Sequence, residues 1–231
     1  MKYHSRHGLV DAMETSGIIP VFNHPDKDVA AQIVDAMYRG GLRVFEFTNR
    51  SANAMEVFTH LLDHVSKYPD IILGIGTVLD EFVTREFIDA GAHFIVSPVL
   101  KVSMAPACDR ANILWIPGCA TPTEVLAARE AGALMVKIFP GSALGPSFVS
   151  SVRSVIPNMR YMITGGVEPD ANNLNSWFAA GASCVGMGSQ LLTREILTTR
   201  SWHVLEQNVT SLLMLLHDIR HQANSITTTK Q

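Results

Sequence analysis

The chain has 231 residues, 47% of them hydrophobic and 17% charged, so it can bury a large core and is not a generally disordered protein. A balance of 18 basic and 21 acidic residues gives no reason to expect nucleic acid or an anionic membrane as a partner. The three cysteines form no CxxC pair, and no apolar run approaches the 18 residues of a membrane span. We therefore expect a cytoplasmic enzyme or binding domain without disulfides.

The predicted elements begin with a short helix at residues 5–16 and continue as strands alternating with helices. Eight apolar runs are the expected strands: 17–22, 42–48, 71–77, 94–98, 113–118, 134–140, 160–166 and 183–189. The stretches between them have helical periodicity and end at glycine. Residues 193–222 form a last helical region of one or two helices, and 224–231 are expected to be a disordered tail. No linker divides the chain, so residues 1–231 are predicted to form a single domain.

Glycines that recur between the end of a helix and the start of a strand support a closed barrel. Gly41, Gly91, Gly132 and Gly181 each end a helix just before a strand, at separations of 50, 41 and 49 residues. Each interval holds two strand-helix units, and a fourfold two-unit period, counting the first and last strands outside the intervals, gives the eight units of a (β/α)8 barrel. The alternative is an open doubly wound sheet, but the first strand ends in VFNHPD and lacks the usual glycine-rich loop. The fold class predicted is α/β, a (β/α)8 TIM barrel with a short N-terminal helix and a C-terminal helical extension.

A single charged residue, Lys137, interrupts the apolar run at 134–140. Strand alternation places two sets of side chains on opposite faces: Met135, Lys137 and Phe139 on one, and Leu134, Val136 and Ile138 on the other. The aliphatic set suits the side that faces the helices. Lys137 is therefore expected to point into the barrel.

Further polar residues follow other strands at the same end of the barrel. In the second run Glu46 and Thr48 share the inward face, and Arg50 continues that parity. Thr77 and Pro98 end the third and fourth runs. Burying separate charges is costly, so the convergence of Lys137, Glu46 and Arg50 indicates a site. A structural ion pair between the lysine and the glutamate is the alternative.

Glycine-rich turns follow the last two strands. They are TGGV at 164–167 and GMGS at 186–189, and each precedes a helix. Backbone amides at such turns can bind an anion, and these two loops are the usual phosphate position in a TIM barrel. A glycine pair can also serve only as a tight turn.

Two histidine pairs have the i, i+4 spacing of a metal site, at His60/His64 and His217/His221. Neither has a third ligand, so exposed helix faces are expected rather than metal sites. The apolar segment SLLMLL is expected to pack on the barrel or on a neighbouring subunit.

The ordered set of motifs resembles a known family. The motifs are FEFTNR (45–50), GIGTVL (74–79), FIVSP (94–98), IPGCATPTE (116–124), KIFPG (137–141), TGGV (164–167) and GMGSQL (187–192). Their order and spacing resemble 2-keto-3-deoxy-6-phosphogluconate (KDPG)/4-hydroxy-2-oxoglutarate (KHG) aldolases, which are class I pyruvate aldolases. The resemblance covers about residues 10 to 195. It implies a (β/α)8 barrel, a homotrimer, and no metal or cofactor.

The resemblance also implies roles for individual residues. Lys137 matches the Schiff-base lysine and Glu46 the catalytic glutamate, while Arg50 and Thr77 match the groups that bind the substrate carboxylate. The remaining matches line the pocket or bind phosphate: Pro98, Phe139 and Thr164 for the pocket, and Gly165, Gly166, Gly188 and Ser189 for phosphate.

The sequence departs from the family pattern at four positions, Asn49, Val99, Gly141 and Met187. These leave the lysine, glutamate and arginine in place, but they leave the substrate preference open.

The predicted activity is retro-aldol cleavage of a 2-keto-3-deoxy-6-phospho sugar acid or of 4-hydroxy-2-oxoglutarate. The products would be pyruvate and an aldehyde, either glyceraldehyde 3-phosphate or glyoxylate. Two alternatives remain: another phosphate-binding TIM-barrel isomerase or synthase, and a non-catalytic keto-acid sensor on the same fold.

Overall fold

The computed structural model describes residues 5–228, with side chains up to residue 221. It opens with helix α1, Arg6–Ser16, as the sequence predicts. The Ser5 hydroxyl accepts a hydrogen bond from the Gly8 amide at 3.1 Å, and Gly17 ends the helix in the left-handed region at φ 68°. The helix is therefore capped by its own flanking residues at both ends.

Every predicted apolar run contains a strand. The strands are β1 (Ile18–Phe22), β2 (Val44–Thr48), β3 (Ile72–Gly76), β4 (Phe94–Val96), β5 (Leu114–Ile116), β6 (Gly118–Cys119), β7 (Met135–Ile138), β8 (Arg160–Thr164) and β9 (Cys184–Met187). The fifth run is divided into β5 and β6 at Pro117. Proline has no amide hydrogen, so the hydrogen-bond ladder breaks there.

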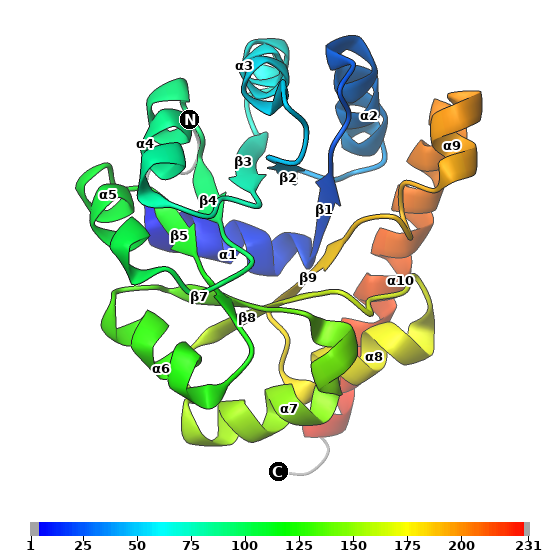
Figure 1. Cartoon of the computed structure of the whole chain (residues 1–231). Coiled ribbons are helices and arrows are strands. Elements are labelled where there is room, and N and C mark those ends of the chain that lie inside the picture. Colours follow the sequence, from blue (N-terminus) through cyan, green and yellow to red (C-terminus); the bar gives the residue numbers. More distant parts are fainter. Residues whose placement is uncertain (1–4, 229–231) are drawn as a thin grey trace.

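The sheet is a parallel barrel, and its two edge strands, β5 and β6, are the two parts of the divided run. The strand order is β5-β4-β3-β2-β1-β9-β8-β7-β6, and β5 and β6 are consecutive in the chain. The Pro117 carbonyl accepts a hydrogen bond from the Lys137 amide at 2.8 Å, while Ile116 accepts one from Ser97 at 3.1 Å. Figure 1 looks into the resulting ring of strands. The predicted TIM barrel is confirmed.

The helices surround this ring, and α1 crosses behind it in Figure 1. The outer helical segments are α2 (Lys27–Arg39), α3 (Ala54–Val65), α4 (Glu81–Ala90), η1 (Val102–Met104), α5 (Ala105–Arg110), α6 (Pro122–Glu130), α7 (Gly141–Val155), α8 (Ala171–Ala180), α9 (Arg194–Thr199) and α10 (Trp202–Thr228). Two helices therefore make up the predicted C-terminal helical region. The predicted disordered tail, residues 224–231, covers the end of α10 and the undescribed residues 229–231, and it stays a prediction.

The core has two layers, one on each side of the barrel wall. The outer layer, between strands and helices, includes Val136 and Ile138 of β7. The inner layer fills the barrel and includes Met135, so Lys137 has the predicted inward parity. Leu134 was expected on the outer face, but it precedes β7 and packs against the inner layer instead.

Helix α1 closes the N-terminal end of the barrel. Its residues Leu9, Val10 and Met13 are buried and belong to the inner layer together with strand residues such as Ile72. An amphipathic helix with its apolar side against the strand ends removes that layer from water. The opposite end, where the strands finish, is left as the mouth of the barrel.

The last helix, α10, packs against α2 and α8. Leu212 and Leu216 of its SLLMLL segment are buried in the outer layer, as expected, whereas Met214 is 65% exposed. Within the described part of the chain, every helix is too short or too polar to span a bilayer.

The histidine pair on α3 differs from the expectation of an exposed helix face. His60 and His64 are half-buried and face α2, where His64 Nε2 lies 2.7 Å from Asp35 Oδ1 and His60 Nε2 lies 3.8 Å from Asp28 Oδ1. Packing of α2 against α3 brings these groups together, which the spacing within one helix does not reveal. His217 and His221 on α10 are exposed, as expected.

Candidate active site

Lys137 and Glu46 meet inside the barrel. The Lys137 Nζ atom lies 3.2 Å from Glu46 Oε1, and the two residues are 3% and 0% exposed. They come from β7 and β2, which are not neighbours in the sheet. The structure thus brings together Lys137 and Glu46, two of the three charged residues for which convergence was predicted, and it places an amine and a carboxylate in hydrogen-bond contact away from bulk water.

The glutamate is not fully satisfied by this pair. Glu46 Oε2 is buried and has no hydrogen-bond partner among the described residues. A buried carboxylate oxygen normally has a partner, and the exceptions call for an explanation. A purely structural ion pair offers no explanation for the unpartnered oxygen. A carboxylate that receives a proton or a hydrogen bond from a bound substrate does explain it.

Gly76 makes room for this carboxylate. A Cβ atom built on Gly76 would lie 1.9 Å from Glu46 Oε1. In the sheet register Gly76 of β3 is paired with Thr48 of β2, two residues beyond Glu46. The inward-pointing Glu46 side chain extends alongside the glycine. The glycine of the GIGT motif therefore shapes the site through its missing side chain.

Arg50 and Thr77 form a second contact at the mouth. Arg50 Nε donates a hydrogen bond to Thr77 Oγ1 at 3.2 Å, and Arg50 is exposed. Thr77 has φ 59°, in the left-handed region that a β-branched residue seldom adopts. Backbone strain of this kind persists where the surroundings fix it, and it is common at functional sites. The two residues predicted to bind a carboxylate are adjacent.

The other predicted pocket residues also come from the ends of strands. Lys137 Nζ lies 5.6 Å from the centre of the Phe139 ring. Pro98 is half-buried against Gly118, where a Cβ atom would lie 2.2 Å from the Pro98 carbonyl carbon. Thr164 Oγ1 is buried and unpartnered among the described residues, beside Gly186. A second polar atom is thus available to a ligand.

The glycine turn after β8 packs against the start of α7. Gly165 and Gly166 have φ values of 89° and 72°, which favour glycine. A Cβ atom on Gly166 would lie 2.8 Å from Ser142 Cα, and one on Gly141 would lie 2.5 Å from the Gly165 carbonyl oxygen. This close approach explains the departure at position 141, because alanine would collide with the turn.

The turn after β9 lies beside the turn after β8, because β8 and β9 are paired up to Thr164 and Gly186. Gly188 accepts backbone hydrogen bonds from the two residues that follow Gln190, and Ser189 is exposed. Met187 is 1% exposed in the outer core layer. At this departure from the family pattern, the Met187 side chain therefore faces the helices rather than the mouth of the barrel.

The two remaining departures lie on loops at the mouth. Asn49 donates its backbone amide to the Gly76 carbonyl at 2.9 Å, so its main chain continues the pairing of β2 with β3. Val99 is 49% exposed next to Pro98. Neither residue displaces a predicted catalytic side chain.

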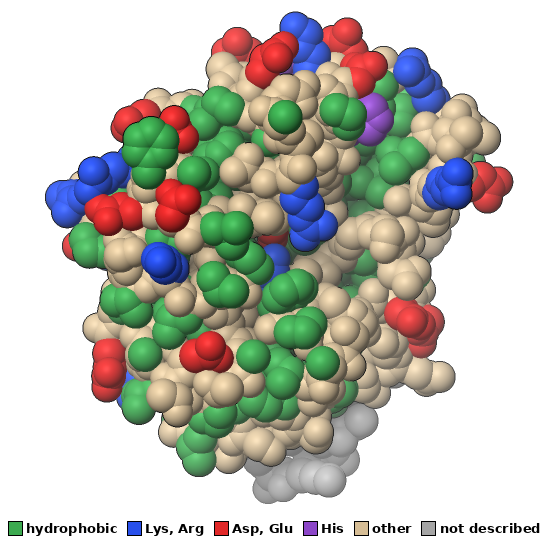
Figure 2. Space-filling view, in the orientation of Figure 1, with side chains coloured by type: hydrophobic (Ala, Val, Ile, Leu, Met, Phe, Trp, Pro, Cys, Tyr) green, Lys and Arg blue, Asp and Glu red, His purple; other side chains and the backbone are tan. Residues whose placement is uncertain are grey.

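The view into the mouth shows a central hollow with basic side-chain atoms at its edge and within it (Figure 2). Among the described residues, no group of three or more histidine, cysteine, aspartate or glutamate side chains could hold a metal ion. The chemistry of the hollow is that of an amine, a carboxylate and a guanidinium.

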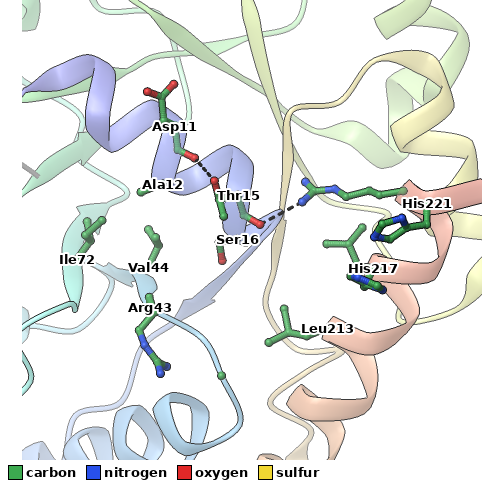
Figure 3. Close-up of a pocket in the computed structure, with 13 residues that line it drawn as sticks. Asp11, Ala12, Thr15, Ser16, Arg43, Val44, Ile72, Leu213, His217 and His221 are labelled. Atoms are coloured by element: carbon green, nitrogen blue, oxygen red, sulfur yellow. Dashed lines mark hydrogen bonds between the residues drawn. The ribbon is translucent and has the colours of Figure 1, made fainter. Parts of the chain in front are cut away.

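A separate cavity of about 540 Å³ lies at the closed end of the barrel, between α1, α10 and the beginnings of β2 and β3 (Figure 3). None of the predicted site residues lines it. Arg43 in its wall is paired with Asp70 at 2.8 Å, and Arg220 donates to the Thr15 and Glu14 carbonyls. Its wall includes Val44 and Ile72 but neither Lys137 nor Glu46, so its size alone does not make it the active site.

Asn23 was not among the predicted site residues. It directly follows β1 and has the parity of Val21, which belongs to the inner layer, whereas Phe22 belongs to the outer one. Its side chain donates to the Thr48 carbonyl at 2.6 Å. Strand alternation gives Asn23 an inward parity, but a polar residue in a loop after a strand does not by itself indicate a site.

Comparisons with known proteins agree with this geometry. A sequence model of the KDPG and KHG aldolase family matches residues 9–208. The 2-dehydro-3-deoxy-6-phosphogalactonate aldolase of Escherichia coli (strain K12) is 36% identical over 55% of this chain and 62% of its own length. The KHG/KDPG aldolase of the same strain is 30% identical over 80% of this chain and 85% of its own.

A solved structure is similar over most of its length. The KDPG aldolase of Legionella pneumophila, with pyruvate captured as a covalent carbinolamine intermediate, has a TM-score of 0.80 and 25% identity. The similarity covers 88% of this chain and 97% of that one.

The fold, the buried lysine and the similarity to these relatives together define the class of protein, which is a lyase with a TIM-barrel fold, namely an aldolase. The chain belongs to the KDPG and KHG aldolase family.

Proposed function

We propose that the protein is a class I aldolase in which Lys137 forms a Schiff base with the ketone of a 2-keto-4-hydroxy acid. The observation that carries this proposal is the buried contact of Lys137 Nζ with Glu46 Oε1 at 3.2 Å, inside the barrel. The covalent carbinolamine of pyruvate in the similar Legionella structure supports it.

The reaction follows from the amine and the carboxylate. The neutral Lys137 amine attacks C2 of the substrate, and loss of water gives a protonated imine. Glu46 accepts the proton of the C4 hydroxyl, the C3–C4 bond breaks, and its electron pair moves toward the imine nitrogen to give an enamine. The aldehyde leaves. A proton returned to C3 and hydrolysis of the imine then release pyruvate and restore the lysine.

Arg50 and Thr77 are proposed to hold the substrate carboxylate. A guanidinium can bind both oxygens of a carboxylate, and Thr77 already contacts Arg50 at 3.2 Å. In this arrangement the carboxylate lies over β2 and β3. The rest of the substrate then extends toward β8, β9 and β1, where the glycine turns lie.

The phosphorylated substrates are one option at that distal end, through Gly165, Gly166, Gly188 and Ser189. The alternative is unphosphorylated 4-hydroxy-2-oxoglutarate, which yields glyoxylate. Both share the pyruvate half that Lys137, Glu46 and Arg50 would bind. Comparing kcat/KM for KDPG, its galactonate isomer and 4-hydroxy-2-oxoglutarate decides among them.

The decisive experiment is reductive trapping. Incubation with pyruvate and borohydride should give a stable pyruvyl adduct on Lys137, mapped by mass spectrometry. Lys137→Ala should lose the adduct and reduce turnover on the order of 10⁴-fold or more, as when other covalent nucleophiles are removed. Lys101→Ala is the matched control, since that lysine is exposed, and its adduct should persist.

An isomerase or synthase would give no adduct, because neither needs an imine. A non-catalytic sensor would bind a keto acid without releasing pyruvate in an assay coupled to lactate dehydrogenase. A wild-type protein without a pyruvyl adduct on Lys137 would refute the aldolase mechanism.

We also propose a homotrimer, as the family resemblance implies. Four exposed apolar side chains support it, all in the segments that follow β3 and β4, including the starts of α4 and η1. We call them the apolar rim: Leu79, Phe82, Val99 and Val102, at 49–72% exposure. Light scattering should give three times the chain mass of 25.2 kDa. Phe82→Glu should lower that mass, and Met214→Glu on α10 should not. A monomeric wild-type protein would contradict the proposal.

The cellular setting proposed is the cytoplasm. The three cysteines are free and buried. Burial raises the pKa of Cys108 and of Cys119 to about 12 and raises that of Cys184 as well. Neutral, inaccessible thiols are compatible with a reducing compartment.

A further inference from the structure

Asn23 lies between the two halves of the proposed site. It follows β1, which pairs with β2 on one side and with β9 on the other. The β2 side carries Glu46 and Arg50, and the β9 side carries Gly188 and Ser189. A substrate whose carboxylate lies over β2 and β3 must pass β1 or β7 on its way to the distal turns.

The orientation of the Asn23 amide is fixed by its contacts. Nδ2 lies 2.6 Å from the Thr48 carbonyl oxygen and 3.4 Å from Ser51 Oγ. Only the nitrogen can donate to a carbonyl oxygen, so the amide cannot be turned around without losing this bond. Among the described residues no donor contacts Asn23 Oδ1, and the side chain is only half-buried. A fixed hydrogen-bond acceptor is therefore presented at the mouth.

The charges of the surrounding loops favour a hydroxyl group as its partner. The stretches 140–152, 165–193 and 23–26 follow β7, β8, β9 and β1, and none of them contains lysine or arginine. Their acidic residues are Asp26, Glu168 and Asp170, and the positive charge of Arg200, at the end of α9, acts on Asp26. An acceptor oxygen in such surroundings pairs with an O–H donor, because it would repel an anionic oxygen.

We propose that Asn23 determines specificity by accepting a hydrogen bond at Oδ1 from a hydroxyl group on the aldehyde half of the substrate. The inference rests on the proposed aldolase function and adds a specificity-determining residue to it, one that recognises a hydroxyl group of the aldehyde. Asn23 is not needed for imine formation, which involves only the pyruvate half.

The test is the aldol reaction of pyruvate with two matched acceptors, propanal and each enantiomer of 2-hydroxypropanal, which differ by one hydroxyl group. The wild-type protein should favour at least one hydroxylated acceptor by about 10-fold in kcat/KM, since one uncharged hydrogen bond is worth that order. Asn23→Ala should abolish the preference and leave kcat/KM for propanal within about 2-fold.

Asn53→Ala is the matched control. Asn53 Nδ2 donates to the Pro25 carbonyl at 2.8 Å, so it ties the same two loops together as Asn23 does. The control should keep the 10-fold preference. If both variants lose activity equally on all acceptors, Asn23 only supports the loops and the inference is wrong.

The absence of a preference in the wild-type protein would also overturn the inference, whether or not the variant folds. This failure is distinguishable from failure of the proposed function. In the first case the pyruvyl adduct on Lys137 still forms after reduction, and in the second it does not.

Discussion

At the scale of single residues, the site depends on glycines as much as on charged side chains. In the proposed mechanism Lys137 and Glu46 supply the chemistry, but the Glu46 carboxylate fits only because Gly76 has no Cβ atom. Gly186 has the same relation to the Thr164 hydroxyl, which a Cβ atom would approach to 2.5 Å. Missing side chains thus fix where the polar atoms lie.

Gly76→Ala tests this relation. The added methyl group would meet Glu46 Oε1 at 1.9 Å and must displace it, because the glycine lies in a strand and cannot move away. We expect kcat/KM to fall by about 10²-fold or more, as for a lost general base, and the protein to be destabilised by about 1–3 kcal/mol. Steady-state kinetics and urea unfolding measure the two effects.

Gly8→Ala is the control for that substitution. A Cβ atom on Gly8 in α1 would meet only Ser5 Oγ, at an ordinary 3.4 Å, so activity should be unchanged. Full activity in the Gly76 variant would show that Glu46 can perform its role from another position.

Contrast with the neighbouring residues explains why the charged residues could be predicted from the sequence and Asn23 could not. Lys137 and Glu46 stand out because each interrupts a buried apolar run. Asn23 follows a strand in an ordinary polar loop, and its partner is a backbone carbonyl 25 residues away. Such a contact leaves no pattern in the local sequence.

At the scale of elements, α1 is the part of the chain that closes the barrel at its N-terminal end. Met13 on this helix is fully buried in the inner core layer. Its length and its caps were predictable from the sequence. Its position under the strands was not, because that depends on which end of the barrel the helix meets.

Met13→Ala should destabilise the protein by about 2–5 kcal/mol, the usual range when a large apolar side chain is removed from a core. Met214→Ala on α10 is the matched control, since that methionine is 65% exposed, and it should change stability by less than about 0.5 kcal/mol. Urea unfolding monitored by circular dichroism compares the two. Equal effects would mean that α1 does not seal the inner layer.

At the scale of the whole molecule, the eight-unit count was correct because helix and strand periods alternate so regularly along the chain. The division of the fifth run at Pro117 was not predicted. A proline inside an apolar run can end a strand or only interrupt it, and its neighbours decide which. Here the backbone amide of Lys137 donates a hydrogen bond to the Pro117 carbonyl, so strand pairing resumes after the proline and the barrel closes at this run.

The stability of the whole fold should depend on pH through His93. Its Nδ1 accepts a hydrogen bond from the Leu73 amide at 2.9 Å, which requires the unprotonated nitrogen, and burial lowers the pKa of His93. The unfolded chain, with a histidine pKa of about 6.5, takes up a proton that the folded chain resists. Stability contributed by neutral His93 is therefore present above about pH 6.5 and falls as the pH drops below it.

Urea unfolding at pH 7.5 and 5.5 measures this effect. One proton accounts for a slope of at most about 1.4 kcal/mol per pH unit. His93→Gln, which keeps an acceptor but does not titrate, should reduce the slope. An unchanged slope would assign the pH dependence to other groups.

The closure of the barrel by α1 has a consequence for the order of events in turnover. With one end sealed by Leu9, Val10 and Met13, substrates and products share a single route through the mouth. In the proposed mechanism the imine to Lys137 would hold the pyruvate half at the deeper position, and the aldehyde half would lie toward the solvent. The aldehyde must therefore depart first and pyruvate last. In the synthetic direction the order would be reversed, so this mechanism predicts that an aldehyde is accepted only after pyruvate has occupied the lysine.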